Sequence, residues 1–189
     1  MSDPANISVL AICGSLRQGS YNMATLRAAI AAKPADMTVS IADISAIPLY
    51  NEDVRAQGFP GPVETLRQQI RMADALLIAC PEYNYSMTGV LKNAIDWASR
   101  PPEQPFAGKP LAIIGAAAGM AGSARAQYDL RRSCVFLDLH PLNKPEVLIG
   151  QAQNKFDSDG NLTDAVARDL LRDLMANLAI WTRLIAKKA

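Results

Sequence analysis

The chain has 189 residues, half of them hydrophobic and a fifth charged, which is an ordinary composition for one soluble globular domain. Nineteen basic and eighteen acidic residues give a formal net charge of +1 with no long block of like charge, so neither nucleic acid nor a membrane surface is expected as a partner. Three cysteines without C-x-x-C spacing and one histidine, His140, argue against a disulfide framework, a metal site and a Ser-His-Asp triad.

Short apolar runs alternate with helical patterns along the chain. No basic stretch precedes the first run and none is long enough to span a bilayer, so a cytoplasmic protein is expected. Strands are predicted over 7–13, 37–43, 75–80, 111–117 and 137–143. Helices are predicted over 20–33, 63–73, 88–99, 123–136 and 163–187, with loops over 46–53, 56–62 and 101–110.

Apolar strands that alternate with helices indicate a parallel sheet covered on both faces. With no internal repeat or low-complexity linker, residues 1–189 are expected to form one doubly wound α/β domain. In such sheets ligands bind beyond the carboxyl ends of the strands, which here means the loops over 14–22, 81–89 and 117–123.

The first of these loops, "CGSLRQGSYN", has the strand, loop and helix layout of a phosphate-binding turn. It holds only two glycines, Gly14 and Gly19, so it lacks the third glycine of a dinucleotide fingerprint. It also lacks the lysine of a triphosphate loop. Both familiar glycine signatures are therefore poor matches.

The polar groups of this loop suit a single terminal phosphate without a metal. Ser15 and Ser20 supply hydroxyls, Arg17 a guanidinium and Asn22 an amide, beside the free N–H groups of a helix start. Alternatively, Ser20 or Asn22 is an ordinary helix cap and Arg17 a solvated surface residue.

The second loop, "PEYNYSMTG", combines a strand-ending proline with aromatic residues. Tyr83 and Tyr85 flank Asn84, and an aromatic side chain at the carboxyl edge of a sheet can cover a flat ring. The alternative is that the two tyrosines close the end of the sheet or form an oligomer contact. A phosphate loop and an aromatic loop at one sheet edge favour a flat phosphorylated cofactor.

Four segments carry a resemblance to a known family: "GSLRQGSYN", "PEYNYSMTGVLKNAIDW", "GSARAQYDLR" and "VFLDLHPLNKPEVLIGQAQNKFD". On these the chain resembles the NAD(P)H-dependent FMN reductases, and within them the bacterial soluble quinone and chromate reductases. The similarity runs from Ile7 to about Asp157. It implies a flavodoxin-like fold, a five-stranded parallel sheet of order 2-1-3-4-5 with helices on both faces.

The resemblance also implies which residues hold FMN, with the phosphate in the first loop and the ring along the second. Relatives often carry serine where this chain has Ala117 or Ala118, and glycine where it has Ser123, so one contact to FMN is expected to be weaker. The implied cofactor-binding residues are Ser15, Leu16, Arg17, Gln18, Gly19, Ser20, Tyr21, Asn22, Pro81, Glu82, Tyr83, Asn84, Tyr85 and Ala117.

The implied activity is the transfer of electrons from NADPH or NADH through FMN to a quinone, chromate, an azo compound or free flavin. The chemistry is the cofactor's, so no catalytic side chain is expected. Arg125, Tyr128 and Glu146 match subunit contacts of the quinone and chromate reductases, which implies a homodimer or homotetramer. Cys13 and Cys80 end strands beside the site and are expected to be buried core residues.

Two other functions are compatible with this fold. A flavodoxin-type electron carrier is usually strongly acidic, which the charge of +1 does not fit. A member of the fold that has lost its cofactor would be colourless.

The segment "DSDGNLTD" echoes a calcium loop but lacks the glutamate at its twelfth position, so a polar turn with Thr163 or Asp164 capping the last helix is predicted instead. The preferred nicotinamide and the physiological acceptor stay open.

Overall fold

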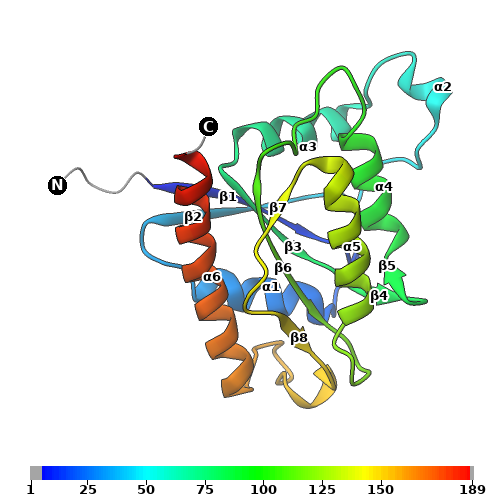
Figure 1. Ribbon diagram of the computed structural model, residues 1–189. Helices are drawn as coiled ribbons and strands as arrows, with labels where there is room; N and C mark the ends of the chain where they lie inside the picture. Colours follow the sequence, from blue (N-terminus) through cyan, green and yellow to red (C-terminus); the bar gives the residue numbers. More distant parts are fainter. Residues whose placement is uncertain (1–5, 188–189) are drawn as a thin grey trace.

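The computed structural model describes residues 6–187, which form a central sheet between two layers of helices (Figure 1). The main sheet is parallel and follows the order β2-β1-β3-β6-β7, with β8 also paired to β6. This confirms the predicted doubly wound sheet of order 2-1-3-4-5. The strands are β1 (Ile7–Cys13), β2 (Met37–Ala42), β3 (Ala75–Ala79), β6 (Pro110–Ala116), β7 (His140–Pro141) and β8 (Val147–Ile149).

The last position of the sheet is divided between two short strands. β7 pairs with the start of β6 and β8 pairs with its end. The predicted strand over 137–143 was therefore wrong in its bounds. The preceding helix continues to Leu137, and Pro141 and Pro145 offer no N–H to a ladder, so pairing stops and resumes further along the chain.

Helices cover both faces of the sheet (Figure 1). The helices α1 and α6 pack on one face, and α3, α4 and α5 pack on the other. The five long helices match the five predicted ones within about two residues at each end, the usual uncertainty of helix boundaries. Their bounds are α1 (Tyr21–Ala31), α2 (Glu52–Arg55), α3 (Gly61–Met72), α4 (Gly89–Ala98), α5 (Ala124–Leu137) and α6 (Ala165–Ala186), with a 3₁₀ turn at Ala152–Asn154.

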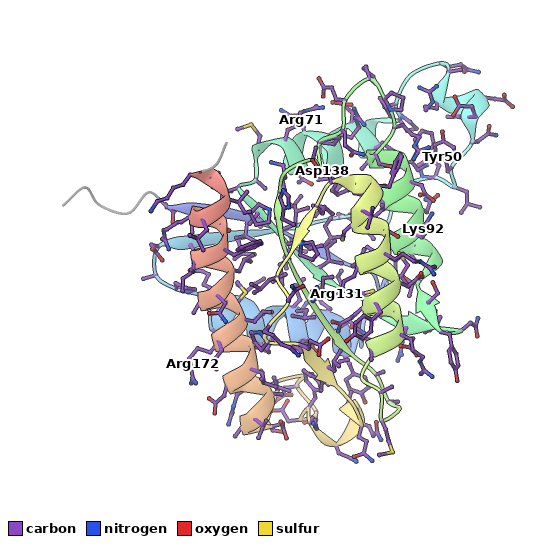
Figure 2. The ribbon with its side chains drawn as sticks, in the orientation of Figure 1. Tyr50, Arg71, Lys92, Arg131, Asp138 and Arg172 are labelled. Atoms are coloured by element: carbon purple, nitrogen blue, oxygen red, sulfur yellow. The ribbon has the colours of Figure 1, made fainter. Side chains whose placement is uncertain are left out.

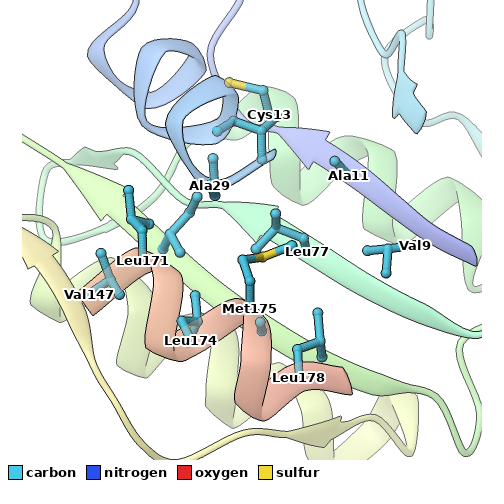
Figure 3. Close-up of a cluster of buried hydrophobic side chains, with 14 of the residues drawn as sticks. Val9, Ala11, Cys13, Ala29, Leu77, Val147, Leu171, Leu174, Met175 and Leu178 are labelled. Carbon is cyan, nitrogen blue, oxygen red and sulfur yellow. The ribbon is translucent and has the colours of Figure 1, made fainter. Parts of the chain in front are cut away.

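Alternate residues of each strand belong to two separate hydrophobic clusters, one on each face of the sheet. Val9 and Ala11 of β1 join the cluster under α1 and α6, where Figure 3 shows them facing the leucines of α6. Leu10 and Ile12 point to the opposite face, under α3, α4 and α5. Because neighbouring side chains of a strand leave opposite faces, a strand buried on both sides must be apolar throughout, as "ISVLAIC" is.

The loop predicted over 46–53 contains the start of a short helix, α2, that sequence patterning missed. Asn51 caps it, accepting the N–H of Asp53 at 2.8 Å. The segment is held against α4, where Trp97 Nε1 donates to the Pro48 carbonyl at 2.8 Å and the Trp97 ring meets that of Tyr50. Figure 2 shows Tyr50 at the α4 side of this segment.

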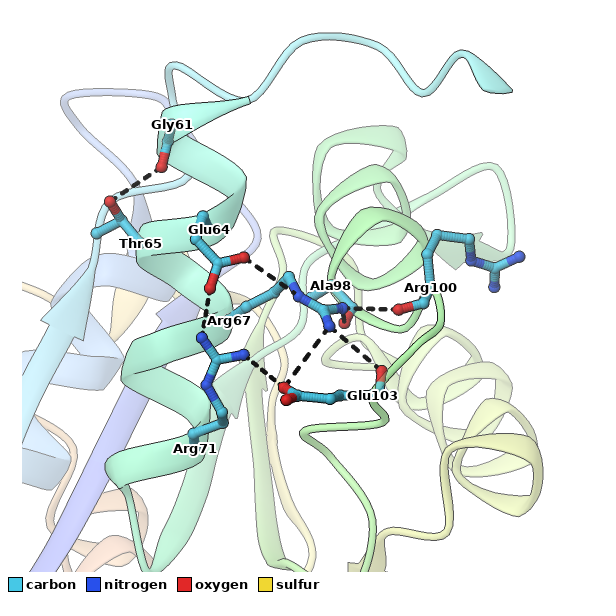
Figure 4. Close-up of polar contacts among 8 residues, drawn as sticks. All are labelled: Gly61, Glu64, Thr65, Arg67, Arg71, Ala98, Arg100 and Glu103. Carbon is cyan, nitrogen blue, oxygen red and sulfur yellow. Dashed lines mark hydrogen bonds and ion pairs between the residues drawn. The ribbon is translucent and has the colours of Figure 1, made fainter. Parts of the chain in front are cut away.

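The proline-rich connection between α4 and β6 is fixed by a buried arginine, Arg67 of α3 (Figure 4). Its guanidinium donates to the carbonyls of Ala98, Arg100 and Glu103 at 2.7, 2.8 and 3.4 Å. The same group stacks on the Phe59 ring, 4.2 Å from its centroid. One side chain therefore joins α3 to the end of α4 and to the loop that follows it.

The segment that echoed a calcium loop is a polar turn. Asp157 accepts the N–H groups of Asp159 and Asn161 at 3.0 and 2.7 Å, so its carboxylate closes the turn itself. As predicted, Asp164 caps α6, accepting the Ala167 N–H at 2.8 Å. Within residues 6–187 no helix combines the length and the apolar character needed to cross a membrane.

Candidate functional site

A cavity of about 390 Å³ opens at the carboxyl edge of the sheet, where the three predicted loops meet. This volume lies within the range of small-molecule and cofactor sites. Five of the predicted residues, Leu16, Gln18, Gly19, Asn84 and Tyr85, are not part of its wall. The other nine do line it: Ser15, Arg17, Ser20, Tyr21, Asn22, Pro81, Glu82, Tyr83 and Ala117.

The first loop presents donors at the start of α1. Ser20 caps the helix, its Oγ accepting the Met23 N–H at 3.2 Å. A hydroxyl that accepts one bond still has its own hydrogen to donate, so helix capping and anion binding are compatible at this residue. The backbone N–H groups of Tyr21 and Asn22 precede the first intrahelical bond, which leaves them free to bind an anion.

Asn22 has a role that its position in the sequence does not reveal. Its amide donates to the Ala116 carbonyl at 2.9 Å and accepts the Ala116 N–H at 3.0 Å. This reciprocal pair ties α1 to the end of β6, and so sets the third loop beside the first. The Asn22 side chain therefore positions the site, and its backbone N–H remains available to a ligand.

The first and second loops are locked together at Gly14. Thr88, the cap of α4, donates from Oγ1 to the Gly14 carbonyl at 2.6 Å. A Cβ added at Gly14 would lie 2.7 Å from Cδ of Pro81 and 3.0 Å from Cβ of Leu91. Glycine is therefore required here by close packing, because Gly14 does not have a positive φ.

The second loop forms a hairpin that sequence patterning did not predict. Strands β4 (Glu82–Tyr83) and β5 (Ser86–Met87) are joined by Asn84 and Tyr85 at φ 50° and 70°. Two positive φ angles define the tight turn that normally reads Asn-Gly. Tyrosine at the second position is strained, and the cost is of order 1–3 kcal/mol. Tyr85 is 72% exposed at the hairpin tip, and Tyr83 beside it is 58% exposed.

Glu82 anchors the hairpin to α5. Its Oε2 accepts the N–H groups of Arg125 and Ala126 at 3.0 and 3.2 Å, and its other oxygen pairs with the Arg125 guanidinium. That guanidinium lies over the Tyr85 ring, 3.9 Å from the centroid. Ser123, at the cap position of α5, makes no capping bond, so Glu82 supplies the cap from another loop.

The third loop is shaped by glycines and by Ser123. A Cβ at Gly122 would lie 2.5 Å from the Leu148 carbonyl carbon, so the loop is pressed against β8. Ser123 has φ 70°, which explains why glycine suits this position better. Its hydroxyl accepts a bond from Gln127 at 3.3 Å and lies in the wall behind the cavity. The Ser123 hydroxyl is therefore satisfied by a partner inside the protein.

Comparison with known proteins identifies the family. The profile of the family described as NADPH-dependent FMN reductase matches residues 7–154. The chain belongs to this family. It is 64% identical over 183 residues to an NAD(P)H-dependent FMN reductase of Pseudomonas aeruginosa, covering 97% of this chain and 98% of that one. It is 50% identical over 153 residues to a quinone reductase of Escherichia coli, covering 80% and 81%.

The fold of this FMN reductase is also that of a solved relative. The flavoenzyme NAD(P)H:(acceptor) oxidoreductase FerB from Paracoccus denitrificans matches with a TM-score of 0.85 at 32% identity, covering 94% of this chain and 97% of that one. The chain is thus an FMN-dependent enzyme that oxidises NAD(P)H. The residues present fit the cofactor, because hydroxyl, guanidinium and helix-start N–H donors line one part of the cavity and Tyr83 lines another.

The cysteines of the reductase do not add a reactive group to the site. Cys13 and Cys80 are buried where β1 and β3 end, as predicted. Burial raises the pKa of the Cys80 thiol to about 12 and also raises that of Cys13. Because the thiolate is the nucleophile, both are unreactive near neutral pH. Across residues 6–187 no group of three or more His, Cys, Asp or Glu side chains is placed to hold a metal ion.

Proposed function

We propose that the three-loop cavity is the FMN site of this reductase and that its acceptor is a quinone. The proposal rests on two kinds of group that line one cavity. Donors able to bind a phosphate lie at the start of α1, and the hairpin that bears Tyr83 lies beside them. Ser15, Arg17, Ser20 and the start of α1 would hold the phosphate of FMN. The hairpin and the third loop, near Ala117, would hold its ring.

When bound, FMN would supply the redox chemistry, a two-electron transfer from NAD(P)H to the acceptor. The chain's own residues bind and orient it. Glu82 and Arg125 fix the hairpin, and Asn22 fixes the third loop. The rim carries exposed apolar groups, Tyr83 and Met120, which favour a flat apolar acceptor. A quinone has this shape, and relatives of the chain are named as quinone reductases.

Arg17→Ala tests the phosphate position. Arg17 has no ion pair within residues 6–187, so its loss is not expected to disturb the fold. A charge-assisted hydrogen bond contributes about 1.5–3 kcal/mol, so the Kd for FMN should rise about tenfold or more. Quenching of flavin fluorescence on binding gives the Kd. Arg172→Ala on the exposed side of α6 is the control; an Arg17→Ala Kd equal to that of the control removes Arg17 from the site.

We also propose that the enzyme is a homodimer or homotetramer built on the outer face of α5. Val135 and Phe136 are 85% and 74% exposed there, about two turns beyond Tyr128 on the same face. Tyr128 donates to Glu146 at 2.7 Å, which fixes its ring at the surface. Exposed apolar side chains gathered on one helix face mark an association surface.

Sedimentation equilibrium checks the oligomer. The wild-type protein should show a mass of two or four times 20.3 kDa at micromolar concentration. Phe136→Glu should shift it toward the monomer, because a carboxylate would be buried without a partner. Val166→Glu, at an exposed apolar position of α6, is the control. A wild-type monomer, or equal masses for both variants, contradicts the proposed interface.

We place the enzyme in the cytoplasm, where its three unpaired cysteines stay reduced.

A further inference from the structure

A second cavity, of about 530 Å³, lies on the outer side of α1. It is bounded by α1, by the turn over 157–162 and by the start of α6, which Figure 1 shows on the same side of the sheet as α1. Residues of α1 line both cavities. Tyr21 of α1 lines the first cavity, and its ring packs on Phe156, which precedes the turn that lines the second cavity. The second cavity has no part in the FMN site.

The floor of this cavity is apolar and smooth. Four alanines of α1 and its cap recur at helical spacing and face the cavity, where larger side chains would fill it. Leu162, which is buried, closes the far side. The four alanines are Ala24, Ala28, Ala31 and Ala32.

Two arginine side chains line the cavity beside this apolar floor. Arg27 comes from α1 and Arg168 from the first turns of α6. Throughout residues 6–187 neither side chain makes a hydrogen bond or an ion pair, whereas Arg172, four residues along α6, pairs with Asp169 at 2.8 Å. Both side chains are exposed and line the same cavity, and an anion bound there would accept their N–H groups.

Asp159 is the acidic group of the same wall. It leaves the three charged side chains with a net charge of +1, which attracts an anionic group. Its carboxylate accepts hydrogen bonds only, which suits a hydroxyl of the ligand.

We propose that this second cavity binds a small organic anion whose phosphate or carboxylate lies between Arg27 and Arg168. The flat apolar part of the ligand covers the alanine floor, and a hydroxyl faces Asp159. A nucleoside monophosphate has all three features, and an aromatic carboxylate has two of them. This site is independent of the electron transfer at FMN.

Calorimetric titration of the FMN-loaded protein tests the proposal with three probes. Adenosine 5′-monophosphate carries the phosphate, the ring and hydroxyls; benzoate carries a carboxylate and a ring; inorganic phosphate carries charge alone. Adenosine monophosphate should bind most tightly. Arg27→Gln and Arg168→Gln should each raise its Kd about tenfold, the effect of losing one charge-assisted bond. Arg172→Gln, one turn away on α6, should leave the Kd unchanged.

A floor variant separates a built cavity from surface charge. Ala31→Leu keeps both arginines, lies at an exposed position and fills part of the floor. It should raise the Kd of adenosine monophosphate and benzoate several-fold and leave that of inorganic phosphate unchanged. The flavin absorbance spectrum should be the same in every variant, which shows that the FMN site is intact. No heat on titration, a wild-type Kd in either arginine variant, or an unchanged Kd in Ala31→Leu would each overturn the proposal.

Discussion

Gly14→Ala is expected to weaken FMN binding about tenfold or more and to lower the free energy of unfolding by roughly 1–3 kcal/mol, the usual cost of an overpacked site. The added Cβ would lie 2.7 Å from Cδ of Pro81, whose ring cannot rotate away, and 3.0 Å from Cβ of Leu91. The first and second loops would have to separate, and they carry the phosphate donors and the tyrosine hairpin. Flavin fluorescence titration and urea unfolding measure the two effects.

Gly61→Ala is the matched control for this variant. Gly61 lies at a loop-to-helix junction, at the start of α3, and nothing lies within 4 Å of an added Cβ there. Its FMN affinity and stability should equal those of the wild type. If Gly14→Ala behaves like Gly61→Ala, the close packing of the two loops does not define the cofactor site.

Arg67→Ala should produce the largest loss of stability among the variants considered. The guanidinium is buried and satisfies the carbonyls of Ala98, Arg100 and Glu103, which would be left without a donor. Leaving a buried carbonyl without a donor costs about 1–3 kcal/mol, and three carbonyls lose their donor here. Urea unfolding at saturating FMN gives the change, with the slope of the transition checked against the wild type.

Arg71→Ala is the control on the same helix (Figure 4). Arg71 pairs with Glu64 and with Glu103, the latter at 2.7 Å, but it is partly exposed. Exposed ion pairs contribute about 1 kcal/mol or less, so its loss should be small. A similar loss for Arg67→Ala and Arg71→Ala would show that the carbonyl contacts of Arg67 do not hold the connection between α4 and β6.

Most of the fold could be predicted from local patterns, because buried strands and helices leave periodic apolar runs. The failures have local physical causes. Pro141 and Pro145 divide the last strand of the sheet, which an apolar run does not signal. The hairpin turn was missed because Tyr85 occupies the position where glycine is usual, and α2 was missed because four residues give no period.

The site was predicted in part. The loops, and nine of the residues that line the cavity, follow from where buried strands end and from the family resemblance. The pairing of Asn22 with Ala116 spans 94 residues and that of Glu82 with Arg125 spans 43, so no local pattern contains either. Asn22 and Glu82 both line the cavity, and the side chain of each also holds two loops in place.

Anaerobic absorbance titration of the FMN-loaded protein tests the central claim most directly. Addition of NADPH or NADH should bleach the flavin band, and addition of a quinone should then restore it with matching stoichiometry. In Gly14→Ala the retained flavin and the bleaching per protein should fall together. A wild-type protein that takes up no FMN, or whose bound flavin is bleached by neither nicotinamide, would contradict the account.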